Sequence, residues 1–251
     1  MARIVAGTRE ADVDLVAFDK DGTLIDFYHL WGRKARLAVE AVVADVGAEA
    51  DLAARLYRSI GYDPASGLAA ADGPLAISSM PKLYTICAVV LYQHGLNWHH
   101  AEAVARRAFA AALGAIPTAD LVKPLGQIQR LFRKLTEAGA RVAIVTGDDR
   151  DATEATMALM GLDGYVSALV CGNDPIPNKP APDALLHLGR HFGVAPGRIA
   201  MVGDTVGDLS TGTAAGAGCR IGVLSGAGRQ DELAPHADAL IANVDDIRVL
   251  A

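Results

Sequence analysis

Cysteine, aromatic residues and long hydrophobic runs are all scarce in this sequence. Its 251 residues include three cysteines, and aromatic residues make up 5%. Cys87, Cys171 and Cys219 lie far apart and are odd in number, which predicts buried thiols and argues against a disulfide framework. The longest apolar stretch, near residues 86–91, is far too short to span a bilayer, and charged residues interrupt the region where a signal peptide would be hydrophobic. We therefore expect a soluble, cytoplasmic protein.

Positive charge is also in short supply. Lys and Arg number 23 against 29 Asp and Glu, which gives a formal net charge of −6. This balance argues against nucleic acid or an anionic membrane as the main partner, although a local site can still bind a small anion. Hydrophobic residues make up 51% of a chain that is long enough for an α/β core and a second small domain. No feature of the sequence indicates an oligomeric state.

Short apolar runs alternate with amphipathic segments at both ends of the chain. Strands are predicted at Leu15–Phe18, Arg141–Val145, Val166–Cys171, Ile199–Val202, Arg220–Val223 and Ala239–Ile241, with a turn near Asp245–Val249. Helices are predicted between them at Leu125–Ala138, Asp149–Met160, Pro182–Phe192 and Leu209–Ala215. This alternation predicts a Rossmann-like parallel sheet with right-handed crossovers, formed by residues 1–26 and 124–251.

Residues 27–123 interrupt this pattern with helices alone. Helices are predicted at Phe27–Val46, Asp51–Ile60, Pro81–His94 and Trp98–Leu113, and the segment Tyr62–Pro81 is predicted to be a loop because it is rich in Ala, Gly, Ser and Pro. A stretch of this length exceeds any ordinary connection between two strands. We therefore predict an inserted α-helical domain at 27–123.

The first predicted strand ends in two acids. Asp19 and Asp21 follow Leu15–Phe18 directly, and Gly22 after them permits a tight turn. Ligands of open α/β sheets bind beyond the carboxyl ends of the strands. Two carboxylates this close repel unless a cation or a shared proton relieves them. A solvated acidic turn is the alternative, but folding gains nothing from the repulsion, so the pattern favours a catalytic site.

Two more loops carry groups that suit an anion. Thr146 and Gly147 stand between a strand and a helix, where a hydroxyl and backbone N–H groups can bind an anion, and capping of the helix by Thr146 is the alternative. Lys179 precedes a helix that Pro182 would open, and the flanking prolines would limit the loop's conformations. The alternative for Lys179 is a solvated surface lysine.

A second strand also ends in an acid pair. Ile199–Val202 is followed by Gly203 and Asp204, with Asp208 four residues later, and a helix-capping acid plus a solvated acid is the alternative. Together Asp19, Asp21, Asp204 and Asp208 against Lys179 leave a charge of −3 at one edge of the sheet. Oxygen ligands at this density suit Mg²⁺, and the lack of neighbouring His or Cys argues against zinc.

These strings resemble, in order, the four motifs of the haloacid dehalogenase superfamily, most of whose members are Mg²⁺-dependent phosphohydrolases. The matching residues are Asp19–Leu24, Thr146, Asn178–Asp183 and Gly203–Asp208. The insert after the first motif resembles the helical cap of the phosphoglycolate-phosphatase and phosphosugar-mutase branch. The resemblance implies hydrolysis of a small phosphorylated metabolite through an aspartyl-phosphate. Lys20 departs from many members of that branch, which carry an apolar residue there.

The resemblance also implies a role for each motif residue. Asp19 would be the nucleophile and Asp21 the general acid and base, while Thr146 and Lys179, with the backbone near Gly22 and Gly147, would hold the phosphoryl group. Mg²⁺ would be held by Asp19, Asp204 and the Asp21 carbonyl, and Asp208 would orient the metal or its waters. Substrate choice is expected to lie in the insert, where the candidates without motif support are Arg33, Lys34, Lys82 and Tyr84.

Several other functions remain open from the sequence. Asp21 argues against a dehalogenase and an ion-pumping ATPase, since the former lack this acid and the latter carry threonine there. A phosphosugar mutase or a phosphonate hydrolase of the same superfamily is the first alternative. The second is a non-catalytic phosphoryl-binding module or a receiver-like signalling module, although receivers are far shorter and their extra acids precede the phosphorylated one.

Overall fold

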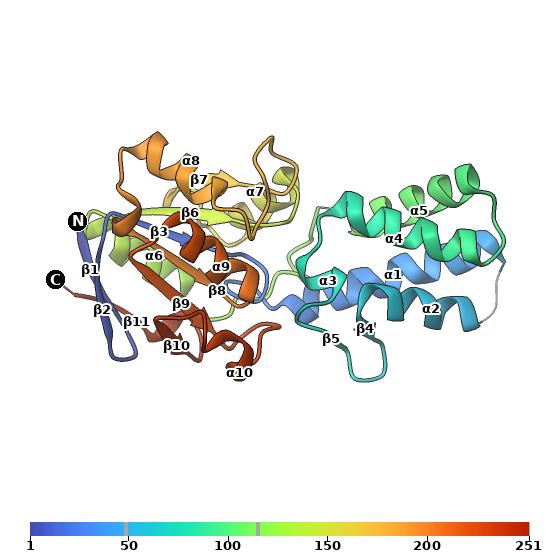
Figure 1. Cartoon of the computed structure of the whole chain (residues 1–251), viewed down its shortest axis with the longest axis horizontal. Helices are drawn as coiled ribbons and strands as arrows, with labels where there is room; N and C mark the ends of the chain where they lie inside the picture. The colour runs from blue at the N-terminus through green and yellow to red at the C-terminus, as the bar shows by residue number, and fades with distance from the viewer. Residues whose placement is uncertain (48–49, 114–115, 251) are drawn as a thin grey trace.

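A six-stranded parallel sheet forms the larger of two lobes in the computed structural model, which describes residues 1–47, 50–113 and 116–250 (Figure 1). Neighbouring strands follow the order β10-β9-β8-β3-β6-β7, and every pair is parallel. Their bounds are β3 Leu15–Phe18, β6 Arg141–Val145, β7 Val166–Val170, β8 Ile199–Gly203, β9 Cys219–Val223 and β10 Ala239–Ile241. The predicted α/β fold class is confirmed.

Strand β3 lies in the middle of the sheet, between β6 and β8. In this register Phe18 is paired with Ile144 on one side and with Val202 on the other. All four residues of β3 are buried, which explains why the strand is apolar on both faces. Because the three strands run in the same direction and end at the same level, the residues that follow them meet at one edge.

Helices cover both faces of this sheet. They are α6 Ile128–Glu137, α7 Arg150–Leu159, α8 Asp183–Phe192, α9 Val206–Ala215 and the short α10 Gln230–Leu233, with 3-10 turns η1 Pro196–Arg198 and η2 Val244–Asp246. Alternate residues of β3 enter two different apolar cores: Val16 and Phe18 pack with α6, whereas Leu15 and Ala17 pack with α8. The sheet is therefore the shared wall between two cores.

Helix α9 begins earlier than the predicted Leu209. Thr205 is its N-cap, and the Thr205 side chain accepts a hydrogen bond from the Asp208 N–H while the Asp208 carboxylate accepts one from the Thr205 N–H at 2.9 Å. This reciprocal capping box adds residues 206–208 to the first turn. As a result Asp208 projects from a helix start rather than from a loop.

A small antiparallel sheet at the chain termini was not foreseen from the sequence. It has the order β11-β1-β2, with bounds β1 Ala2–Ala6, β2 Arg9–Val13 and β11 Ile247–Leu250. Strand β11 replaces most of the turn predicted near 245–249. The hairpin turns at Gly7, whose φ of 57° suits a glycine, and the two chain ends lie close together in Figure 1.

The smaller lobe is helical and has a hydrophobic core of its own (Figure 1). Its helices are α1 Phe27–Val46, α2 Ala50–Ile60, α3 Pro74–Ile77, α4 Met80–Gln93 and α5 Trp98–Leu113. The predicted loop at Tyr62–Pro81 is corrected: it contains α3 and a hairpin of β4 Tyr62–Asp63 and β5 Leu68–Ala69. The Asp63 carboxylate accepts hydrogen bonds from the Ala65 and Ser66 N–H groups, and this local turn closes the hairpin.

Two adjacent segments connect the lobes. The Asp26 N–H donates to the Lys123 carbonyl at 2.9 Å, and Lys123 Nζ lies 3.3 Å from Asp26 Oδ2. Asp26 is also the N-cap of α1, where its side chain accepts from the His29 N–H. The helical lobe is thus attached to the sheet lobe through two neighbouring connecting segments. Within the described residues, every helix is too short or too polar to cross a membrane.

Candidate active site

A cavity of about 610 Å³ lies at the carboxyl edge of β3, β6 and β8, between the two lobes. Seven of the residues predicted from the motifs line it, namely Asp19, Asp21, Thr146, Gly147, Lys179, Asp204 and Asp208. The eighth, Gly22, lies against Asp204: its φ is +90°, and an added Cβ would stand 2.4 Å from Asp204 Oδ2. Four separate stretches of the chain therefore meet in one place.

Lys179 bridges two carboxylates inside this cavity. Its Nζ donates to Asp19 Oδ1 at 2.5 Å, to Asp208 Oδ1 at 2.6 Å and to the Val145 carbonyl at 3.0 Å. Burial disfavours the ammonium, but the charges of Asp19 and Asp208 outweigh burial and keep the pKa of Lys179 above its ordinary value. Lys179 is therefore a largely buried, ion-paired lysine, with its side chain 15% exposed, and not a solvated surface lysine.

The three aspartates Asp19, Asp204 and Asp208 form a buried acidic cluster. One oxygen from each lies within 4.8 Å of the others. Burial, reinforced by the charges of Asp208 and Asp21 and opposed by Lys179, raises the pKa of Asp19 to about 7. Burial and the charges of Asp19 and Asp208 likewise hold the pKa of Asp204 well above its usual value. A set of buried oxygen donors with excess negative charge fits a hard divalent cation such as Mg²⁺.

Groups that the motif reasoning did not assign hold Asp204 in place. Thr23 Oγ1 donates to Asp204 Oδ1 at 3.2 Å, and the Ala227 N–H donates to Asp204 Oδ2 at 2.8 Å. The loop after β9 also approaches so closely that a Cβ on Gly226 would lie 2.0 Å from Asp204 Oδ2. Thr23 lies two residues after Asp21 in the first motif, but the contact with Ala227 depends on folding and has no local signal.

Thr146 is buried at the end of β6. Its Oγ1 accepts a hydrogen bond from the Asp148 N–H at 3.2 Å, and this leaves the hydroxyl hydrogen for another acceptor. Helix α7 begins at Arg150 with Asp149 as its N-cap, so Thr146 does not cap the helix. Its position beside Lys179 in the cavity lining suits an anion-binding role.

A second charge cluster joins the loop after β3 to the loop after β6. Lys20 is fully buried, and its Nζ lies 2.8 Å from Asp21 Oδ2. The same Nζ forms an ion pair with Asp148 Oδ2 at 2.9 Å that does not have the geometry of a hydrogen bond. Burial disfavours the ammonium, yet Asp148 and Asp21 keep the pKa of Lys20 above its ordinary value. Lys20 thereby fixes the orientation of the Asp21 carboxylate. Asp148 was not among the predicted site residues.

Lys20→Met should lower the free energy of unfolding by about 3–5 kcal/mol, because it leaves the buried Asp148 carboxylate and the part-buried Asp21 carboxylate without their cation. Chemical denaturation measures the change. The matched control is Lys82→Met, at an exposed lysine, which should cost less than about 0.5 kcal/mol. The double variant Lys20→Met/Asp148→Asn should recover part of the loss. If Lys20→Met is as stable as the parent protein, the Lys20 ion pairs do not stabilise the fold.

Of the four candidates for substrate choice, Lys82 lines the cavity. Arg33 is exposed, and its Nη1 lies 3.4 Å from Asp120 Oδ2. The Arg106 guanidinium carbon lies over the Tyr84 ring, 5.8 Å from the ring centroid. Lys34 is buried with its Nζ 5.1 Å from the Trp31 ring centroid. These three are absent from the cavity lining within the described chain. The sequence reasoning missed most of the helical lobe's contribution, which is largely apolar.

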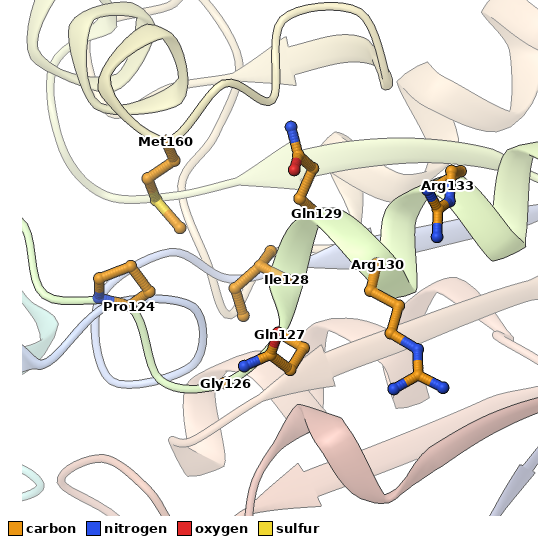
Figure 2. A pocket seen from close by; sticks show the side chains of 8 residues that line it. All are labelled: Pro124, Gly126, Gln127, Ile128, Gln129, Arg130, Arg133 and Met160. Carbon is orange, nitrogen blue, oxygen red and sulfur yellow. The ribbon is translucent and has the colours of Figure 1, made fainter.

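A second, smaller cavity of about 240 Å³ lies at the start of α6 (Figure 2). Ile128 and Met160 supply its apolar side, and Figure 2 shows Arg130 extending away from Met160. The Gln127 N–H at the helix start already donates to Asp245 Oδ1 at 2.7 Å, and the Gln129 side chain donates to the Gly161 carbonyl. The residues that line this cavity include no acid, thiol or hydroxyl. Of these two cavities, the larger one holds the catalytic types of side chain.

The chain matches known proteins over most of its length. The family model for haloacid dehalogenase-like hydrolase matches residues 13–216. A phosphoglycolate phosphatase of Nitrosococcus oceani is 33% identical over 81 residues, which cover 32% of this chain and 36% of that relative. A phosphoglycolate phosphatase of Yersinia pestis is 25% identical over 92% of this chain and 90% of its own length. The alignment with the first relative is thus confined to about a third of each protein.

The fold is shared with solved structures. The crystal structure of a predicted phosphoglycolate phosphatase from Haemophilus somnus superposes with a TM-score of 0.67 at 19% identity, covering 92% of this chain and 94% of the other. At this identity the similarity establishes the arrangement of sheet and helical cap. The choice of substrate has to be argued from the residues of the cavity.

Proposed function

Because the chain belongs to the haloacid dehalogenase-like hydrolase family, we propose that it is a Mg²⁺-dependent phosphatase that hydrolyses a small phosphomonoester through an aspartyl-phosphate. The observation that carries the proposal is the position of Asp19 directly after β3. Its carboxylate is held by Lys179, which also contacts Asp208, and it lies close to the Asp204 carboxylate. The phosphoglycolate phosphatases among the relatives support the phosphomonoester class.

Two aspartates would carry the bond changes. An Asp19 oxygen attacks phosphorus while the bond from phosphorus to the leaving oxygen breaks, and Asp21 gives that oxygen a proton. Asp21 then takes a proton from water, and the water oxygen attacks the phosphorus of the aspartyl-phosphate. Inorganic phosphate leaves, and Asp19 is restored as a carboxylate. Both side chains face the same cavity, as this sequence of steps requires.

The surrounding groups would hold the phosphoryl oxygens. Lys179 and the Thr146 hydroxyl, both in the cavity lining, would contact these oxygens together with backbone N–H groups near Gly22 and Gly147. Asp208, through its bond to Lys179, keeps the ammonium aimed at Asp19. Asp19, Asp204 and the Asp21 carbonyl would hold Mg²⁺, which would offset the negative charge of the cluster and polarise the phosphoryl group.

We assign residues 27–123 to a cap that closes over this site. The helical lobe has a separate core and is joined to the sheet lobe through two adjacent segments at Asp26 and Lys123. Such an attachment permits a rigid-body movement about few backbone bonds. Closure would exclude water from the aspartyl-phosphate until Asp21 activates one molecule.

Asp21→Asn should lower kcat by about 10²-fold for an alkyl phosphate, because the leaving alkoxide then receives no proton. The formation of the aspartyl-phosphate from 4-nitrophenyl phosphate should be affected far less, because nitrophenolate leaves without a proton. Burst kinetics measure the two steps separately. Equal losses in the first step for both substrates would contradict the assignment of Asp21 as the acid.

Phosphate release with an alkyl phosphate tests the function itself. We expect many equivalents of inorganic phosphate per chain, since the proposal is a catalytic hydrolysis. Release that stops after one equivalent would indicate a signalling module, and formation of an isomeric ester without phosphate would indicate a mutase. Either result would overturn the phosphatase proposal.

A further inference from the structure

The wall that the helical lobe contributes to the cavity is mostly apolar. Seven of its eleven lining residues are apolar, including two aromatic residues from α1, Phe27 and Trp31. Leu75 and Ile77 of α3 and Met80 at the start of α4 continue this surface. We call the eleven residues the cap wall. The cap wall is opposite the carboxylates of the sheet lobe, where the leaving group of a bound phosphomonoester would project.

The charges around the cap wall do not favour a second anionic group. Among the described residues of the helical lobe, Lys82 is the one cationic side chain that lines the cavity. Asp72 lies in the same wall and carries the opposite charge. Glu232 of α10 adds another carboxylate at the rim of the sheet lobe. All three side chains are exposed, so water screens them. A carboxylate on the leaving group would meet no net positive charge.

The cavity is also larger than a two-carbon leaving group needs. Its volume of about 610 Å³ is in the range of pockets that enclose drug-sized ligands. The phosphoryl group and its cation would fill only the end next to Asp19 and Lys179. Phe27, Trp31, Leu75 and Met80 are already largely buried by the fold, whereas Ile77 is 54% exposed. A small leaving group would leave the exposed Ile77 surface in contact with water, and binding would gain nothing from that surface.

We propose that the substrate is a phosphomonoester of an uncharged alcohol with a sizeable apolar body, aromatic or branched aliphatic, rather than of a hydroxy acid or a sugar. This inference rests on the proposed phosphatase function and names its substrate class. The apolar body packs on Trp31, Leu75 and Ile77, and the hydroxyl groups of Ser78 and Ser79 offer hydrogen bonds to a single polar substituent. Hydrolysis yields inorganic phosphate and the neutral alcohol.

A panel of alkyl phosphates tests the class without changing the leaving-group chemistry. The panel is 2-phenylethyl phosphate, butyl phosphate, 2-phosphoglycolate and glucose 6-phosphate, all esters of aliphatic alcohols, assayed with Mg²⁺. We expect kcat/KM for 2-phenylethyl phosphate to exceed that for 2-phosphoglycolate by about tenfold or more, with butyl phosphate between them. A higher kcat/KM for 2-phosphoglycolate or glucose 6-phosphate overturns this inference alone. No release from any of the four overturns the phosphatase function and the inference with it.

A charge placed on the cap wall tests its role directly. Ile77 is 54% exposed, so Ile77→Lys should fold normally while it adds a cation beside the leaving group. We expect the ratio of kcat/KM for 2-phenylethyl phosphate to that for 2-phosphoglycolate to fall about tenfold or more. Leu37→Lys is the matched control, since Leu37 is 48% exposed on the helical lobe and does not line the cavity. An unchanged ratio in Ile77→Lys, or the same change in Leu37→Lys, would show that the cap wall does not select the leaving group.

Discussion

Asp19→Asn is expected to lower phosphate turnover by a factor on the order of 10⁵, the largest loss of any single substitution in the site. The amide that replaces the carboxylate is a very poor nucleophile, and Asp208, which also contacts Lys179, is held by its capping bond to the Thr205 N–H. The fold should not suffer. Burial, and after it the like charges of Asp208 and Asp21, raise the pKa of Asp19 to about 7, so a neutral side chain of the same shape costs less to bury and relieves repulsion.

The assay is steady-state phosphate release with an alkyl phosphate, accompanied by thermal unfolding of the metal-free protein. Asp163→Asn is the matched control, because Asp163 is an exposed aspartate in the turn before β7. We expect the control to keep the activity of the parent protein. Asp19→Asn with more than about one hundredth of the parent activity would show that another residue attacks phosphorus.

Removal of divalent cations should abolish turnover, with a loss of about 10⁴-fold that added Mg²⁺ restores. Asp19, Asp204 and Asp208 form a buried cluster of negative charge. Among the described residues that line the cavity, Lys179 is the cation that contacts this cluster. A phosphate dianion would add to this charge. Without a cation the negative charges of substrate and nucleophile repel, and the attack becomes slow.

The pH dependence of metal binding follows from the same cluster. The pKa of Asp19 is raised to about 7 by burial first and then by neighbouring carboxylates, and that of Asp204 is raised as well. Below these pKa values the carboxyls of the metal-free protein hold protons that a cation must displace. The apparent Kd for Mg²⁺ should therefore be higher at about pH 6 than at about pH 8. Full activity in excess chelator, or Mg²⁺ affinity that does not change with pH, would contradict the assignment of the acidic cluster as the metal site.

The sheet could be predicted from sequence because its strands are buried on both faces. A run such as Leu15–Phe18 is apolar throughout and ends at a charged residue, so both the strand and its end are visible in the sequence. Helix α1 was predicted with its observed bounds because Asp26 and Gly47 mark its two ends, as their cap geometry shows. The resemblance to the superfamily could be recognised from four short sequence motifs, which the fold brings together at the carboxyl edge of the sheet.

The features that were missed depend on contacts between distant residues. The hairpin of β1 and β2 is completed by β11 at the other end of the chain, and neither part has a strong pattern alone. Lys20 was noticed as a departure from the motif, but its ion pair with Asp148 joins loops 128 positions apart in a way that no local pattern predicts. The cap wall was missed for a related reason. Its apolar side chains have the same spacing in the sequence as core residues, so no pattern separates the residues of the cap wall from those of the core.

Covalent attack by Asp19 can be tested by trapping the aspartyl-phosphate. In Asp21→Asn, 4-nitrophenyl phosphate should still transfer its phosphoryl group, whereas the hydrolysis that follows lacks its general base. The phosphorylated protein should then accumulate and can be trapped by rapid acid quenching, digested and mapped by mass spectrometry. We expect one phosphoryl group per chain, on Asp19. A phosphoryl group on any other residue, or steady release of phosphate with no phosphorylated peptide at any time, would contradict it.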